Sequence, residues 1–339
     1  MPAAVPFDTA AELFLGLEGR YAGTGKAALG FKNRETKAWE DISWDTFAAD
    51  VRAFAAFLVA RGVAPGDRVA VLSENRPEWP TADLATQIVG AVNVGIYPTL
   101  PAPQVAAILR DSGAAVVVAS TAIQVRKATA ALAECPDLRL VVAMSHPKGG
   151  ETEGVVTWAT ALAEGRAAGR DAEVQARAEA VTPESLSALI YTSGTTGEPK
   201  GVRMTHRNIT TNVHAVHERI DVFETDSVLS FLPLSHAFER TTGYLTLLSG
   251  GGHIVYAEST DTVARDLPEV HPTILVSVPR LFEKVYTAIQ KTVAEGGPLK
   301  QQIFAWAVGV GTAVAARRRA GRAPGVLLGA QHALAHRLV

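Results

Sequence analysis

Four hydroxyl side chains, two glycines and a lysine lie close together in one short segment of the chain. The segment reads Thr192-Ser193-Gly194-Thr195-Thr196-Gly197-Glu198-Pro199-Lys200. Glycines let the backbone turn and bring N–H groups close to an anion. Hydroxyls donate hydrogen bonds to phosphate oxygens, and a lysine adds a mobile positive charge. The composition of this segment therefore predicts a phosphate-binding loop.

The segment differs from the common P-loop, which requires Gly-Lys-Ser/Thr in sequence. Pro199 stands where that motif has glycine, and Gly201 stands where it has the hydroxyl. An apolar run over residues 186–191 predicts a short buried strand before the loop. A helix that begins near Thr205 would bring further N–H groups toward a bound anion. The alternative is an ordinary Gly/Ser/Thr turn between a strand and a helix.

The elements around this loop alternate between strand and helix patterns. Ser43 is placed to cap a helix, and Pro77 is placed to start the next one. Strands are predicted over residues 68–72, 92–97, 114–119, 138–144, 228–232, 253–256 and 274–277. Helices are predicted over residues 104–110, 121–133 and 281–293. This alternation favours an α/β fold with parallel strands and helices on both faces.

The apolar rhythm weakens from His146 to about Pro183 and resumes after it. This stretch is the predicted connection between two parts of the chain. We therefore expect a first α/β subdomain over residues 1–180. A second subdomain over residues 181–339 would carry the loop and be incomplete at its C-terminal end.

The string Tyr-Thr-Ser-Gly-Thr-Thr-Gly-Glu-Pro-Lys-Gly resembles the AMP-binding signature of the adenylate-forming enzymes. Two further blocks resemble the long-chain fatty acyl-CoA synthetase branch, namely Leu-Pro-Leu-Ser-His-Ala-Phe-Glu-Arg at 232–240 and Ser-Val-Pro-Arg-Leu-Phe-Glu-Lys-Val-Tyr at 277–286. The resemblance covers the chain from about Ala10 onward. It implies two stacked, doubly wound, mainly parallel sheets with flanking helices, as in the large N-terminal domain of that family.

The resemblance implies a two-step reaction. A long-chain fatty acid carboxylate attacks the α-phosphate of ATP and gives acyl-AMP and pyrophosphate. The thiol of coenzyme A then attacks the acyl carbonyl and releases AMP. Because an anion approaches a polyanion in the first step, N–H dipoles, lysine and Mg²⁺ must offset the charge.

The resemblance also assigns roles to residues of the loop. Ser193, Thr195 and Thr196 would contact phosphate, while Gly194 and Gly197 would shape the turn. Thr192 matches a position that helps bind magnesium, and Lys200 would meet the leaving pyrophosphate. A lone hydroxyl is a poor magnesium site, because this ion prefers carboxylate, phosphate and water.

The resemblance extends to His236, whose region would line the acyl-adenylate and the entry to the thiol tunnel. Glu239 and Arg240 have two interpretations with equal support, a role in the site or ordinary pairing at a helix start. For Arg280, a structural role as the anchor of a helix is favoured over a role in the wall of the acyl pocket. Residues 75–79 and 90–99 resemble family blocks that form scaffold near the pantetheine channel.

Several family motifs are expected downstream of Val339, including a magnesium-binding glutamate, a ribose-binding aspartate and a catalytic lysine. The chain is therefore interpreted as a fragment whose partner is the missing C-terminal part of its own domain. Two alternatives stay open. One is part of a fatty acyl-AMP ligase, which passes its acyl group to a carrier protein. The other is a non-catalytic nucleotide-binding module.

Composition narrows the class of protein. The chain has 339 residues, 47% of them hydrophobic, and a formal charge of −2, which gives no reason to expect nucleic acid. A single cysteine, Cys135, fits a reducing compartment, and no secretory signal is visible, so we expect a cytoplasmic protein. Three arginines at 317–319 favour a solvated helix end, with peripheral attachment to the inner membrane face as the alternative.

Overall fold

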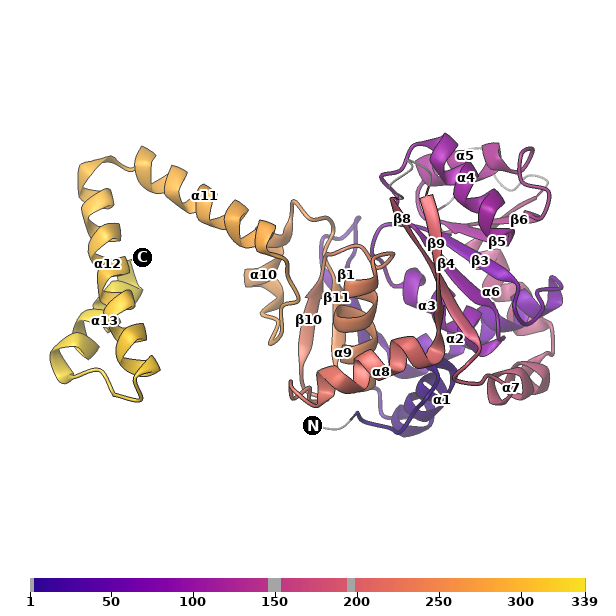
Figure 1. The fold of residues 1–339 in the computed structure, drawn as a ribbon, viewed down its shortest axis with the longest axis horizontal. Helices are drawn as coiled ribbons and strands as arrows, with labels where there is room; N and C mark the ends of the chain where they lie inside the picture. The colour runs from indigo at the N-terminus through magenta and orange to yellow at the C-terminus, as the bar shows by residue number, and fades with distance from the viewer. Residues whose placement is uncertain (1–2, 146–153, 194–198, 339) are drawn as a thin grey trace. The chain divides into compact units, whose positions relative to one another are not determined.

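The computed structural model describes residues 3–145, 154–193 and 199–338 (Figure 1). The chain divides after Val276 into two compact units. The first unit contains every strand described below, and the second unit is helical.

The larger sheet of the first unit has seven strands in the order β7-β6-β5-β3-β4-β8-β9. All neighbours are parallel except β8 and β9, which pair antiparallel. The strands are β3 (Arg68–Leu72), β4 (Val92–Ile96), β5 (Ala114–Ala119), β6 (Leu140–Ala143), β7 (Val155–Thr157), β8 (Leu186–Ser193) and β9 (Pro199–Thr205).

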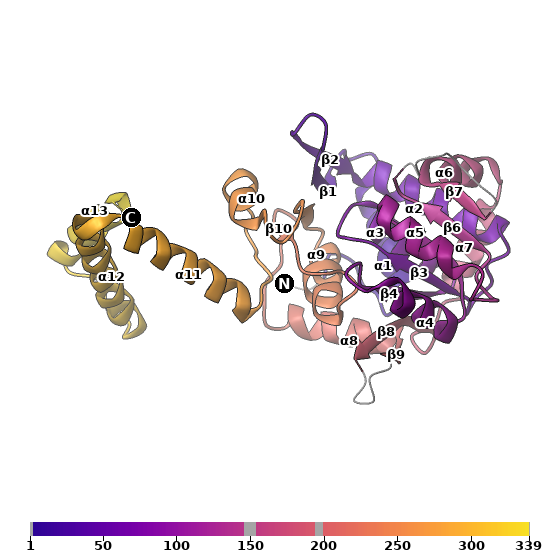
Figure 2. The same ribbon diagram turned by 90° about the horizontal axis from the view of Figure 1, so that it is seen from above.

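The smaller sheet has four strands in the order β10-β11-β1-β2. Only β2 runs antiparallel to its neighbour. Figures 1 and 2 show β1 and β10 grouped apart from the larger sheet. The strands are β1 (Ala27–Lys32), β2 (Trp39–Ser43), β10 (Ser227–Ser230) and β11 (His253–Tyr256). Two mainly parallel sheets in an α/β fold are thus confirmed.

Helices cover both faces of the larger sheet. Val69 and Val71 of β3 belong to one core cluster, which also includes Leu29 and Ile254 of the smaller sheet. The intervening Ala70 belongs to a second cluster, shared with α4 and α5. Because side chains alternate along a strand, β3 is buried on both faces. The helices of the first cluster include α1 (Ala10–Tyr21), α2 (Trp44–Ala60), α3 (Glu78–Ile88), α6 (Trp158–Ala167) and α7 (Asp171–Glu179), and those of the second are α4 (Ala102–Ser112) and α5 (Ala122–Ala131).

Local signals set several helix ends as the sequence predicts. The Ser43 side chain accepts a hydrogen bond from the Thr46 N–H at the start of α2, and Pro77 precedes α3. Thr205 caps α8 (His206–His217) with a capping box. The remaining elements of this unit are a π-helix (Glu239–Leu245), α9 (Thr246–Ser249) and α10 (Val263–Val270).

The predicted connection over residues 146–183 is wrong for its described part. This part supplies β7 to the larger sheet and two helices to the core. A Cβ at Gly165 of α6 would overlap the Ala53 carbonyl of α2, so only glycine permits this close helix contact. The predicted boundary between subdomains, after residue 180, does not separate the two sheets, because β8 and β9 belong to the same sheet as β3. The division of the chain into subdomains 1–180 and 181–339 stays a prediction.

The second unit consists of α11 (Pro279–Glu295), α12 (Gly297–Arg319) and α13 (Val326–Leu338). Its core cluster contains three buried residues, Ala307, Val310 and Ala335, and α11 has none. The predicted strand over 274–277 is reduced to a single bridge between Ile274 and Val228. Outside the gaps at 146–153 and 194–198, no helix has the length and apolar character needed to cross a bilayer.

Candidate functional site

The predicted phosphate loop closes a hairpin between β8 and β9. Thr192 pairs with Lys200 across the ladder, and Ser193 pairs with Pro199. The side chains of Thr192 and Lys200 are exposed at this end of the sheet. The predicted loop residues Gly194, Thr195, Thr196 and Gly197 lie outside the described residues. The structure therefore shows the two strands that hold the loop (Figure 1).

The N-terminus of α8 does not serve this loop, contrary to the expectation from sequence. Seven residues of β9 intervene, and Thr205 pairs with Leu186 at the opposite end of the hairpin. At about 3.3 Å per residue, β9 places the start of α8 roughly 20 Å from the loop. The N–H groups at the start of α8 are therefore too far away to bind an anion held by the loop.

Tyr191 secures the strand that leads into the loop. Its hydroxyl donates to Asp111 Oδ2 of α4 at 2.6 Å, and burial with this neighbour raises the pKa of Tyr191. Across the ladder, a Cβ at Gly201 would lie 3.0 Å from the Tyr191 ring. The last glycine of the motif thus makes room for an aromatic ring, which the sequence did not reveal.

His236 lies at the carboxyl end of β4, beside the strand that leads into the loop. Gly95 of β4 pairs with Ile190 of β8, and a Cβ at Gly95 would lie 3.0 Å from Ser235 Cα. The exposed His236 ring meets the ring of Tyr97 edge-on, with centroids 6.3 Å apart. The structure thus brings the histidine segment and the base of the phosphate loop to adjacent strand ends.

A turn of backbone hydrogen bonds orients the imidazole of His236. Its Nδ1 accepts from the Phe238 N–H at 3.2 Å, which leaves Nε2 as the ring nitrogen free to carry the proton. The His236 N–H donates to the Pro233 carbonyl at 2.9 Å. The imidazole is therefore fixed by a hydrogen bond at Nδ1, while Nε2 stays available to a ligand.

Arg240 is a structural clamp that joins the π-helix to α3 and β4. Its guanidinium donates to Asp83 Oδ1 at 2.7 Å and to Asn93 Oδ1 at 2.9 Å. Asp83 is fully buried, and Arg240 is 3% exposed. Arg240 also stacks over the Trp79 ring, 5.8 Å from its centroid. Burial raises the pKa of Asp83, while the Arg240 charge opposes that rise. Of the two interpretations of Arg240, the structure supports pairing with neighbours.

Glu239, the residue before Arg240, is buried separately, and the two do not pair with each other. Glu239 is 1% exposed and accepts a hydrogen bond from Ser230 Oγ at 2.7 Å. A Cβ at Gly243, one π-helix turn on, would lie 2.5 Å from the Glu239 carboxylate. Burial raises the pKa of Glu239 to about 7. π-Helical turns of this kind often accompany functional sites.

The raised pKa of Glu239 predicts a specific pH dependence of stability. Below its ordinary value of 4.5, the carboxyl is protonated in both the folded and the unfolded chain. As the pH rises from 4.5 to 7, only the unfolded chain ionises, so unfolding becomes easier by up to about 3 kcal/mol. Glu239→Gln removes this contribution, so the variant should gain stability relative to the parent between pH 5 and pH 8. Denaturant unfolding of both proteins at pH 5 and pH 8 measures this gain. An equal difference in stability between variant and parent at the two pH values would contradict the prediction.

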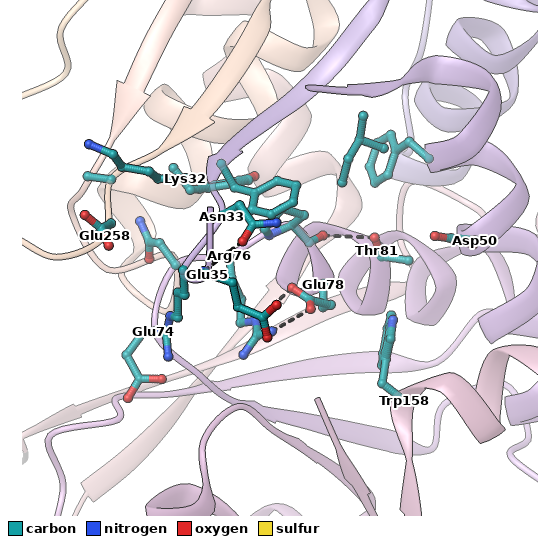
Figure 3. Close-up of a pocket in the computed structure, with 18 residues that line it drawn as sticks. Lys32, Asn33, Glu35, Asp50, Glu74, Arg76, Glu78, Thr81, Trp158 and Glu258 are labelled. Atoms are coloured by element: carbon teal, nitrogen blue, oxygen red, sulfur yellow. Dashed lines mark hydrogen bonds and ion pairs between the residues drawn. The ribbon is translucent and has the colours of Figure 1, made fainter. Parts of the chain in front are cut away.

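A cavity of about 560 Å³ lies where strand ends of both sheets meet. Figure 3 shows Arg76 and Glu78 joined there by hydrogen bonds of 2.6 and 2.7 Å. The lining combines apolar side chains such as Trp158 with charged ones such as Glu74. Thr192, Lys200 and His236 do not line it. This cavity is therefore separate from the predicted site, although Asn75 belongs to its wall.

Magnesium was predicted to bind at Thr192. One hydroxyl oxygen does not make a magnesium site. Among the described residues, no group of three His, Cys, Asp or Glu side chains could hold a metal ion. The described residues therefore do not by themselves form a magnesium site.

The histidines of α8 have structural partners. His206 Nδ1 accepts from the Ala10 N–H at 3.1 Å, and His214 Nε2 lies 2.9 Å from the Phe7 carbonyl oxygen. His217 Nε2 lies 2.8 Å from Ser249 Oγ. Burial lowers the pKa of His206 to about 4, so this ring is neutral and can accept. These contacts tie α8 to the N-terminal segment and to α9.

Sequence reasoning missed the partners of the buried charges. Asp83 lies in α3, where every residue but Glu78 is buried. A carboxylate within so buried a helix needs a partner, because an unpaired buried charge is costly. The sequence did not show this burial, since α3 contains several polar residues, and Arg240 lies 157 residues further along the chain.

The chain is similar in sequence to several known proteins. A family model described as AMP-binding enzyme matches residues 21–326. The long-chain-fatty-acid–CoA ligase FadD15 of Mycobacterium bovis is 36% identical over 310 residues, which cover 89% of this chain and 49% of that protein. The rat long-chain-fatty-acid–CoA ligase ACSBG1 is 30% identical over 291 residues, 84% of this chain and 40% of that protein.

Solved structures show the same fold. The adenylation domain of a carboxylate reductase from Mycobacterium chelonae matches with a TM-score of 0.68 and 25% identity, over 87% of this chain and 50% of that one. ATP-bound MatB from Rhodopseudomonas palustris matches with a TM-score of 0.64 and 23% identity, over 81% and 50%. The chain thus spans about half the length, or less, of the relatives that it matches.

Proposed function

The chain belongs to the AMP-binding enzyme family, and from this premise we propose that it is the ATP- and acyl-binding part of a long-chain fatty acid–CoA ligase. The observation that carries the proposal is the meeting of the β8–β9 hairpin and the His236 segment at adjacent strand ends. The relatives named long-chain-fatty-acid–CoA ligases support the choice of a long-chain substrate.

The proposed chemistry of this chain is binding and orientation. The loop between Thr192 and Lys200 would hold the phosphates of ATP through its N–H groups and hydroxyls. Lys200 would stabilise the pyrophosphate as it leaves. His236, free at Nε2, would face the acyl-adenylate and the approaching coenzyme A thiol. Holding the carboxylate and the α-phosphate in line removes much of the entropic cost of their encounter.

The whole reaction is proposed for a protein that continues beyond these residues, because the chain spans about half the length of its relatives. The resemblance assigns a magnesium carboxylate, a ribose-binding aspartate and a catalytic lysine to segments after residue 339. Each lost contact of a charged group costs roughly 1.5–3 kcal/mol, so the loss of several together removes turnover. Residues 1–339 alone should bind ATP weakly and form no acyl-CoA.

A hydroxylamine-trapping assay tests this expectation. Palmitate, ATP, Mg²⁺ and hydroxylamine are supplied to residues 1–339 and to the same protein extended past residue 339. We expect acyl-hydroxamate only from the extended protein, with acyl-CoA formed when coenzyme A is added. Turnover by residues 1–339 at the extended protein's rate would overturn the need for further segments. Acyl-hydroxamate without any use of coenzyme A would favour a fatty acyl-AMP ligase, and its complete absence would favour a non-catalytic module.

A further inference from the structure

Asn75 joins the end of β3 to the segment that follows β10. Its Nδ2 donates to the Leu232 carbonyl at 2.7 Å and lies 3.1 Å from Ser230 Oγ. Its Oδ1 accepts from the Leu234 N–H at 3.1 Å. One side chain therefore uses both ends of its amide to fix three residues more than 150 positions away.

These contacts lie immediately before His236. Leu234 and Ser235 are buried, at 1% and 5% exposed, so the Asn75 side chain anchors a segment that is packed against the sheet. Gly95 of β4 also approaches Ser235 so closely that a Cβ would lie 3.0 Å from its Cα. The backbone before His236 is thus held by hydrogen bonds from the Asn75 amide and by close packing against Gly95.

The Ser230 contact extends the network to a buried carboxylate. The same Ser230 hydroxyl that lies against Asn75 donates to Glu239 Oε1. Glu239 begins the π-helix that follows His236. Ser230, which precedes His236, is therefore linked both to Asn75 and to Glu239, which follows the histidine.

We propose that Asn75 is a positioning residue for His236. It touches neither ring nitrogen of the histidine and acts by holding residues 230–234 against the end of β3. The proposal rests on the proposed function, in which His236 meets the acyl-adenylate. It adds that the amide of Asn75 sets where the imidazole stands relative to the β8–β9 hairpin.

Asn33 is the matched control. It also lines the cavity of Figure 3, and its side-chain amide makes three hydrogen bonds of 2.8 to 3.2 Å. Its partners are Glu35, Thr36 and Glu40, all on the β1–β2 hairpin. Asn33→Ala therefore removes a comparable set of hydrogen bonds without touching the segment that holds His236.

The first measurement follows the imidazole of His236 by NMR in the isotope-labelled chain, with the signals assigned through His236→Gln. Asn75→Ala should shift these signals, whereas Asn33→Ala should leave them unchanged. Gly95→Ala perturbs the same segment through Ser235 and should also shift them. It keeps the inference testable if Asn75→Ala fails to fold. Unchanged His236 signals in a folded Asn75→Ala chain, or an equal shift in Asn33→Ala, would overturn the proposal.

The second measurement uses adenylation by the extended protein. Asn75→Ala should lower kcat about 10- to 100-fold, the effect expected of a misplaced group, with little change in the KM for ATP. In a His236→Ala background the same substitution should cost nothing further, because the group that it positions is already gone. Additive losses would contradict positioning. If the parent protein shows no adenylation while the NMR shifts appear, the proposed function fails and the positioning of His236 stands.

Discussion

Asp83→Ala should lower the free energy of unfolding of the first unit by about 3–5 kcal/mol. The variant leaves the Arg240 guanidinium buried without its carboxylate, since Arg240 is 3% exposed and Asp83 is fully buried. Asn93 would remain as a partner, but a neutral amide does not compensate a buried charge. A loss of this size approaches the whole stability of many domains.

Denaturant unfolding followed by Trp fluorescence measures this loss, because Trp79 lies directly beneath Arg240. Glu184→Ala is the matched control, since Glu184 pairs with Arg207 in an exposed ion pair and should change stability little. Replacing both members of the buried pair, as Asp83→Leu with Arg240→Met, should recover much of the loss. If Asp83→Ala lowers the free energy of unfolding no more than Glu184→Ala does, the Arg240 guanidinium has another buried partner. The role of the Asp83–Arg240 pair as a structural clamp would then be wrong.

Lys200→Ala should slow adenylation about 10- to 100-fold, which corresponds to the loss of one charged hydrogen bond. Thioester formation should slow much less, because pyrophosphate leaves only in the first step. The side chain is exposed and lies on the edge strand β9, so its loss removes no packing. The effect should therefore appear in the rate and leave the stability unchanged.

Single-turnover kinetics of each half-reaction in the extended protein tests the role of Lys200. Arg203→Ala is the control, since Arg203 is an exposed cation on the same strand, about 10 Å further from the loop. It should leave both half-reactions unchanged. Equal slowing of both steps by Lys200→Ala, or slowing of thioester formation alone, would contradict the assignment to pyrophosphate.

The sequence by itself determined most secondary-structure elements and the α/β class. The bounds of β3, β5 and β11 agree with their predicted ranges, because continuous apolar runs between turn residues are local signals. The helix ends at Ser43 and Thr205 were equally local, since a capping hydroxyl binds N–H groups of its own helix. The phosphate-binding role of the loop between β8 and β9 was predicted from its residue types alone and stays a prediction.

Four strands of the structure, β1, β2, β7 and β9, were not predicted from the sequence. For β7 and β9 the reason is that such a signal is missing. β7 has three residues, too few to show a period, and it joins the sheet only because β6 offers a free edge. β9 begins with Pro199 and contains Gly201, which usually mark a loop. An edge strand tolerates both, since proline at its first residue breaks no ladder. Placing β9 there also moved the start of α8 away from the phosphate loop.

The tertiary structure alone decided which distant residues became partners. Asp83 and Arg240, or Asn75 and Leu232, meet because the chain returns to the ends of β3 and β4 after more than 150 residues. A residue's type shows that a buried charge or amide must be satisfied, since an unpaired polar group in the core is costly. The residue type does not show which distant group becomes the partner, because that depends on how the elements of the two sheets pack together. The phosphate-binding role predicted for the loop is thus inferred from local sequence, while the position of His236 near the base of the β8–β9 hairpin is a property of the fold.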